Sequence, residues 1–174
     1  MTSFGEAWKR HYGSALPFGH SLRMDHRAIR FYALPGAKRY ATTPEEEAEI
    51  RRRAHGIAGA LFDAESDIWR VHCVHVDARD DADARSAAAL PILDEVFEPW
   101  SEERFRVHAI EERWEPSKHD ALLHDLAEDV VDHVLFFNAI SGTVFAPYDG
   151  GFDVIFARSE AYETMRSFEP TWSR

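Results

Sequence analysis

The chain contains a single cysteine, Cys73, among its 174 residues. A lone cysteine can form neither an internal disulfide bond nor a cysteine-rich zinc site. No apolar run approaches the roughly 20 residues that a membrane-spanning helix needs, since even the stretch 134–137 is ended by Asn138. The first residues, Met-Thr-Ser-Phe-Gly-Glu, lack the basic head and apolar stretch of a signal peptide. We therefore expect a cytoplasmic protein that does not contact a membrane.

Basic residues are also in short supply. The chain has 20 Lys and Arg against 31 Asp and Glu, which gives a net charge of −11. This sign opposes the binding of phosphate backbones by charge, so nucleic acid is not an expected partner. The acidic excess is concentrated in residues 61–135, which carry seven basic and twenty acidic side chains. Such a block is usually a solvated face, but it can also attract a basic protein partner.

The sequence motifs of several enzyme classes are missing. There is no G-x-S-x-G elbow for a serine nucleophile, and neither G-x-x-x-x-G-K-[ST] nor G-x-G-x-x-G for a nucleotide. Cys73 lies among valines in a predicted strand, where a free cysteine behaves as a small buried hydrophobe. We therefore expect no catalytic nucleophile of these kinds.

The ten histidines do not form a pair with metal-ligand spacing. His72 and His75 are three residues apart on a predicted strand, so their side chains point to opposite faces. On a predicted helix, His119 and His124 are five residues apart and miss the four-residue spacing of a zinc-binding helix. We expect neither a metal ion nor another cofactor.

Four acidic residues, Asp77, Asp80, Asp81 and Asp83, resemble the start of an EF-hand loop. A calcium loop beginning at Asp81 needs glycine at its sixth position and an acid at its twelfth, where this chain has serine and isoleucine. The calcium interpretation fails. We instead expect an exposed loop whose carboxylates lack fixed partners, so that neutralising Asp80, Asp81 and Asp83 together slows association with a basic partner and barely changes stability.

The clearest helix start is the T-x-x-E box of Thr43 and Glu46, with Pro44 at the first helical position. Apolar residues at helical spacing extend this helix to about Phe62. Further helices are expected over 3–11, 119–130, from an N-cap at Ser159 to about 168, and over 87–97, where Pro91 interrupts the helix.

Strands are expected over 24–34, 67–77, 105–110, 133–140, 143–146 and 152–157. The segment 67–77 has apolar side chains on both faces, which indicates an interior strand, and the last three strands form a meander. No repeat, linker or break in composition divides the chain. We predict one α+β domain over residues 1–174, with a central mixed, mostly antiparallel sheet of about six strands flanked by helices.

Several blocks occur in a recognisable order. They are A-I-R-F-Y-A-L at 28–34, R-A at 53–54, L-F at 61–62, D-I at 67–68, and the stretch 133–157 with Tyr148 and Asp149. From 25 to 170 the chain resembles a bacterial family catalogued as a domain of unknown function, whose members carry an I-R-F-E-L strand and a Y-D-D-R-G turn. The family's glutamate is Tyr32 here, and its turn lacks the second acid and the arginine. The resemblance implies a compact α+β domain and brings no reaction or cofactor.

Arg30 is the first candidate for a binding residue, because it lies between two apolar residues of a predicted strand. A half-buried guanidinium needs a carboxylate partner, and Asp149 or Asp153 could supply it. The functional interpretation is an anion-binding cleft formed by Arg30, Tyr148 and Asp149. The structural interpretation, which we favour from the sequence, is a tie between an early strand and the last hairpin.

These observations leave two classes of function open. The first is a non-enzymatic acidic binding protein with a basic partner, comparable to immunity or antidote proteins by analogy only. The alternative is a small hydrolase or transferase with a site near the C-terminal hairpin. An enzyme should show polar residues that converge in a deep pocket, whereas a binding protein should show an acidic or apolar patch.

Overall fold

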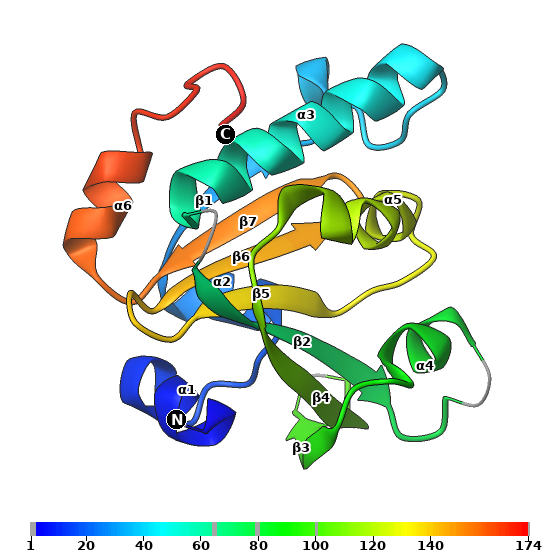
Figure 1. Ribbon diagram of the computed structural model, residues 1–174, viewed down its shortest axis with the longest axis vertical. Helices are drawn as coiled ribbons and strands as arrows, with labels where there is room; N and C mark the ends of the chain where they lie inside the picture. Colours follow the sequence, from blue (N-terminus) through cyan, green and yellow to red (C-terminus); the bar gives the residue numbers. More distant parts are fainter. Residues whose placement is uncertain (1–2, 64–65, 79–80, 100, 174) are drawn as a thin grey trace.

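One antiparallel sheet of seven strands runs through the molecule (Figure 1). The computed structural model describes residues 3–63, 66–78, 81–99 and 101–173. The strands are β1 (Arg27–Tyr32), β2 (Asp67–His75), β3 (Ile92–Glu98), β4 (Glu103–Arg113), β5 (Val134–Asn138), β6 (Thr143–Tyr148) and β7 (Gly151–Phe156), in the order β1-β7-β6-β5-β2-β4-β3.

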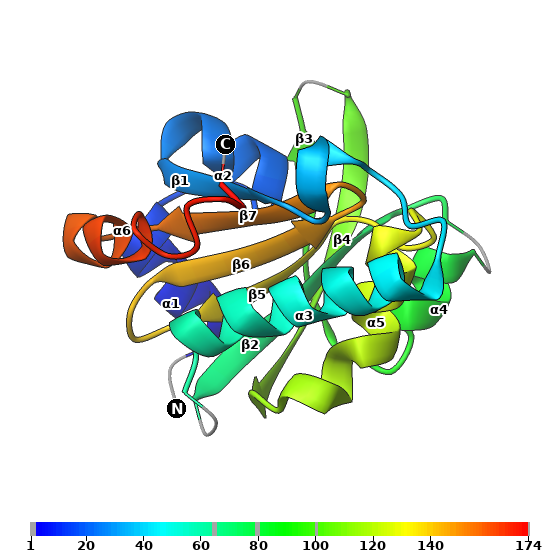
Figure 2. The ribbon, with the colours of Figure 1, turned by 90° about the horizontal axis from the view of Figure 1, so that it is seen from above.

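Helices cover both faces of this sheet (Figure 2). They are α1 (Phe4–Tyr12), α2 (Gly19–Asp25), α3 (Pro44–Leu61), α4 (Ala82–Ala87), α5 (Asp120–Ala127) and α6 (Ser159–Met165), with short 3₁₀ helices η1 (Pro35–Ala37) and η2 (Pro116–His119). The core has two layers: α3, α5 and α6 pack on one face, and α1 and α2 pack on the other. The α+β prediction is confirmed. Among the described residues, no helix is long and apolar enough to cross a membrane.

The sheet differs from the prediction in two ways. It has seven strands rather than about six, and every pairing in the described chain is antiparallel rather than mixed. The additional strand is β3, which lies where a helix interrupted by Pro91 was predicted. Proline lacks the N–H that a helix requires, so α4 ends before Pro91 and the chain beyond it pairs with β4.

The start of α3 is as predicted at Thr43 and different at Glu46. The Glu46 N–H donates to Thr43 Oγ1 at 3.3 Å, and Pro44 is the first helical residue. The Glu46 carboxylate, however, accepts from the N–H of Thr42 at 2.7 Å. Only half of the expected capping box is therefore formed in α3. Both halves are formed in α1, between Ser3 and Glu6.

Helix α6 lies where the sequence predicted it and differs at its ends, whereas α4, over 82–87, was not predicted. Ser159 is the first residue of α6 and not its N-cap, since Arg158 occupies that position without a side-chain hydrogen bond. The helix ends at Met165, short of the predicted end at residue 168. Helix α2 was not predicted, because its polar sequence lies within a range that we assigned in part to a strand.

Two predictions about the strands are confirmed. β2 lies between β4 and β5, which confirms it as an interior strand, and β5, β6 and β7 form the predicted meander. β1 then pairs with β7, with Arg30 directly opposite Asp153. This pairing needs glycine at position 151, because a Cβ there would lie 2.1 Å from the carbonyl oxygen of Phe31. An early strand is thereby brought against the C-terminal hairpin.

Candidate functional site

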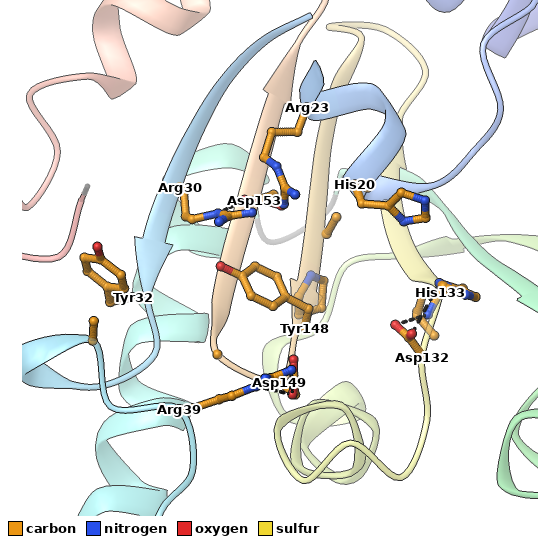
Figure 3. A pocket seen from close by; sticks show the side chains of 16 residues that line it. His20, Arg23, Arg30, Tyr32, Arg39, Asp132, His133, Tyr148, Asp149 and Asp153 are labelled. Atoms are coloured by element: carbon orange, nitrogen blue, oxygen red, sulfur yellow. Dashed lines mark hydrogen bonds and ion pairs between the residues drawn. The ribbon is translucent and has the colours of Figure 1, made fainter. Parts of the chain in front are cut away.

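A polar pocket of about 400 Å³ opens beside the turn between β6 and β7 (Figure 3). Its walls come from five segments: α2, the strand β1, the residues after η1, the start of β5, and the β6–β7 hairpin. We call it the hairpin pocket. Its charged and titratable lining residues are His20, Arg23, Arg30, Tyr32, Arg39, Asp132, His133, Tyr148, Asp149 and Asp153.

Two arginines in the hairpin pocket share one carboxylate. Arg30 on β1 donates from Nε to Oδ1 of Asp153 at 3.1 Å, and Arg23 on α2 donates to the other oxygen, Oδ2. Asp153 is only 2% exposed, whereas the side chains of Arg30 and Arg23 remain 26% and 30% exposed. Both carboxylate oxygens of Asp153 therefore have hydrogen-bond partners within the protein, while both guanidinium groups still face the pocket.

Tyr148 lies against Arg30, whose Cζ is 5.3 Å from the centre of the phenol ring. Cations placed near an aromatic face in this way are stabilised by the ring's negative potential. Burial, followed by the charge of Asp153, raises the pKa of Tyr148 to about 12. The phenol is therefore protonated at neutral pH and can donate a hydrogen bond.

Asp149 belongs to a second cluster, at the opposite end of the pocket from Arg23. Its Oδ2 accepts from the hydroxyl of Tyr40 at 2.7 Å and from the guanidinium of Arg39. This hydrogen bond raises the pKa of Tyr40. Asp149 is thus the partner of Arg39 and Tyr40, and Asp153, the other candidate from the sequence, is the partner of Arg30.

The remaining wall is formed by His20 and His133, whose ring centres are 5.8 Å apart. His133 has a φ of 53°, a conformation uncommon for residues other than glycine. Its Nδ1 lies 3.4 Å from Oδ2 of Asp132, and its carbonyl accepts from the N–H of Cys73 at 3.0 Å. Burial, followed by the neighbouring His133, lowers the pKa of His20. These surroundings favour the neutral imidazole of His20 over the protonated form.

The structure brings the three sequence candidates, Arg30, Tyr148 and Asp149, to one pocket. Sequence reasoning missed Arg23 and Arg39, which lie in a helix and a loop segment that carried no motif. A signal for Arg23 existed only in the excess of basic over acidic residues in the first 60 positions. That excess does not indicate which arginines line the pocket.

Comparison with known proteins identifies the family of this chain. The model of a family described as a domain of unknown function (DUF3885) matches residues 18–172. The chain belongs to this family. Neither the search of curated proteins nor the search of solved structures found a match.

Of the blocks that carry the resemblance to the DUF3885 family, the first and the last meet in the hairpin pocket. Arg30 comes from the first block and Tyr148 and Asp149 from the last, and all three line the pocket. The positions where this chain departs from the family pattern, Tyr32 and Gly150, line it too. The turn lacks the family's arginine, yet Arg39 places a guanidinium on Asp149 from another segment.

Outside the pocket, the acidic loop is more structured than expected. Asp81 caps α4 by accepting from the N–H of Ala84 at 2.8 Å, and Asp83 accepts from the N–H of Asp132 at 2.8 Å. Burial raises the pKa of Asp83. The expectation of carboxylates without fixed partners is therefore wrong for both residues, and Asp80 lies outside the described residues. In the described chain, no group of three or more His, Cys, Asp or Glu side chains is arranged to hold a metal ion.

Proposed function

We propose that this DUF3885-family protein binds a small anionic ligand, one that carries a phosphate or carboxylate group, in the hairpin pocket. The observation that supports the proposal is the pair Arg23 and Arg30, which share the single carboxylate of Asp153. Neither guanidinium is therefore fully neutralised by a partner of its own, although the three arginines and three aspartates of the whole lining balance in formal charge. The chain as a whole is acidic, with a net charge of −11, so this arginine pair is locally richer in positive charge than the chain.

The hydrogen-bond geometry supports the same ligand class. Arg30 uses Nε for Asp153, and its two terminal nitrogens have no partner among the described residues. A guanidinium held by one partner presents its other N–H groups in a fixed plane, which suits the oxygens of a phosphate or carboxylate. The volume of about 400 Å³ lies within the range of small-molecule sites, roughly 300–1,000 Å³.

Two histidines favour a catalytic version of this site, the hydrolase or transferase near the C-terminal hairpin. His20 and His133 face each other across 5.8 Å, and Asp132 lies beside His133. Such groups are suited to proton transfer next to a bound anion. Hydrolysis of p-nitrophenyl phosphate that is lost in His133→Gln and retained in the exposed-site control His124→Gln would support catalysis. Absence of turnover alongside phosphate binding would leave a binding protein.

The binding of a basic protein remains a separate proposal. The hairpin pocket does not support it, since the partly exposed guanidinium groups of Arg23 and Arg30 would repel a basic surface. The exposed edge of the sheet at β3 favours it instead.

A ligand screen by thermal denaturation tests the proposed function. Ligands that bind only the folded chain raise its melting temperature, and the rise grows with the logarithm of ligand concentration above the dissociation constant. We expect inorganic phosphate or citrate to raise the melting temperature above that in chloride of equal ionic strength. The two arms separate phosphate from carboxylate recognition. Equal melting temperatures in all three salts at millimolar concentrations would contradict the proposal.

A further inference from the structure

β3 forms one edge of the sheet, and its outer side has no neighbouring strand among the described residues (Figure 1). The backbone groups on such an edge are a template for a further strand. Three large apolar side chains of β3 are exposed, Ile92 by 56%, Leu93 by 45% and Phe97 by 54%. An open edge that carries exposed apolar side chains has the features of a strand-addition site.

A groove of about 560 Å³ lies between this edge and α1. Phe4 and Trp8 line it from α1, Leu93 and Val96 line it from β3, and Trp69 lines it from β2. The indole N–H of Trp69 is buried and has no hydrogen-bond partner among the described residues. The groove thus offers apolar walls beside the open edge, together with a donor that lacks an acceptor.

The exposed side chains lie on both faces of β3, which indicates whether a bound segment that covers them is a helix or a strand. Val96 packs against the core layer beneath α1, so Phe97, the next residue, points to the opposite face. A helix laid in the groove would cover Leu93 and leave Phe97 in solvent. An added strand sends alternate side chains to both faces and covers both. The bulge of β3 lies between Ile92 and Asp94, so the register is regular beyond it.

Charge decides between a second copy of this chain and another protein. β3 carries three acidic residues, Asp94, Glu95 and Glu98, and no basic residue. Two copies joined through this edge would place acidic strands side by side, and like charges across a strand pair are destabilising. Glu95 already pairs with Arg104 at 3.1 Å and Arg106 at 3.3 Å on its β4 side. A basic strand on the outer side would repeat this arrangement.

We propose that the β3 edge binds an extended, basic segment of another protein as an eighth strand. Apolar side chains of that segment fill the groove beside Leu93, and its Lys or Arg side chains lie near Asp94 and Glu95. A segment of about seven residues matches the length of β3. The site is on a different wall of the molecule from the hairpin pocket and does not depend on the ligand bound there.

The test uses a fluorescein-labelled peptide of four Lys-Val repeats and measures its fluorescence anisotropy with the full chain. We expect saturable binding, and at least tenfold weaker binding of the matched peptide of four Glu-Val repeats. Leu93→Ser and Phe97→Ser should each weaken the Lys-Val complex at least fivefold. Met24→Ser and Ile140→Ser are the controls, because Met24 and Ile140 are 79% and 80% exposed at other places. These two should bind as the parent does.

Three results would overturn the proposal. The first is no binding of the Lys-Val peptide at low salt, and the second is binding that Leu93→Ser and Phe97→Ser leave unchanged. The third is a dimer in sedimentation velocity that Phe97→Ser dissociates, which would assign the edge to a second copy. Arg30→Met should leave peptide binding unchanged, so failure here and failure of the anion-binding proposal are distinguishable.

Discussion

Asp153 is the residue on which the hairpin pocket depends. It is almost fully buried, and each of its oxygens accepts from an arginine of a different element. Removing one partner of a buried ion pair leaves an uncompensated charge, which costs more than the pair itself contributes. The same contact therefore connects β1 and α2 to β7 and orients the guanidinium groups toward the pocket.

A double-mutant cycle separates the true partner of Arg30 from its neighbour. Arg30→Met and Asp153→Asn should each lower the free energy of unfolding, with a coupling well above the additivity error of roughly 0.3 to 0.5 kcal/mol. The matched cycle of Arg30→Met with Asp149→Asn should be additive, because Asp149 bonds Arg39 and Tyr40. Urea denaturation measures both cycles. Coupling in the second cycle and none in the first would refute the assignment.

His72 should make the fold sensitive to acid. It is 1% exposed, and burial, with the nearby Arg70, lowers its pKa from 6.5 to about 3. Between these values the unfolded chain binds a proton that the folded chain does not, so this contribution is complete above about pH 6.5 and falls as the pH drops toward 3. The pH dependence of the urea midpoint should be shallower in His72→Gln than in the parent. The exposed His124→Gln is the control, and equal slopes in all three proteins would contradict the assignment.

At the scale of elements, the sequence predicts best where several local signals agree. Thr43, Pro44 and the apolar period together predicted α3, and valine-rich composition predicted β2 as an interior strand. Prediction failed where a competing contact from outside the local motif determines the structure. The Glu46 carboxylate does not complete the capping box because it accepts hydrogen bonds from Lys38 and Thr42 instead. β3 and α2 were missed because neither has a clear periodicity of its own.

Thr43→Ala tests the start of α3. The substitution removes the oxygen that accepts the Glu46 N–H and should destabilise the fold by about 1 kcal/mol. Thr43→Ser keeps that oxygen and should stay near the parent. The midpoints of chemical denaturation give both values. A midpoint for Thr43→Ala equal to that of the parent would show that this cap contributes nothing.

Gly151→Ala tests the pairing of β1 with the hairpin. The new Cβ would lie 2.1 Å from the Phe31 carbonyl oxygen, so the strands must separate, at a cost of about 2 kcal/mol. Gly150→Ala is the matched control. Its Cβ would meet only side-chain atoms, of Arg39 at 3.4 Å and of Tyr148 at 3.5 Å, so the change in stability should stay within about 0.5 kcal/mol. Equal stabilities of the two variants would contradict the described β1–β7 register.

At the scale of the whole molecule, the acidic excess of the chain does not extend to the hairpin pocket, whose lining has three arginines and three aspartates. Composition alone indicated the net acidity and led to the expectation of a basic partner. It did not reveal the arginine cluster, because Arg23, Arg30 and Arg39 are spread over three segments that only the sheet order brings together. The site could be predicted from the sequence as far as Arg30, Tyr148 and Asp149, and their actual partners could not.

The most direct test of anion binding is a calorimetric titration of phosphate into the parent, Arg30→Met and Arg27→Met at constant pH and ionic strength. Arg27 is exposed on the same strand, so its replacement removes the same charge without touching the pocket. We expect one site in the parent, binding at least tenfold weaker in Arg30→Met, and parental affinity in Arg27→Met. Circular dichroism checks that each variant is folded. Parental affinity in a folded Arg30→Met, or equal losses in both variants, would contradict an anion site built on Arg30.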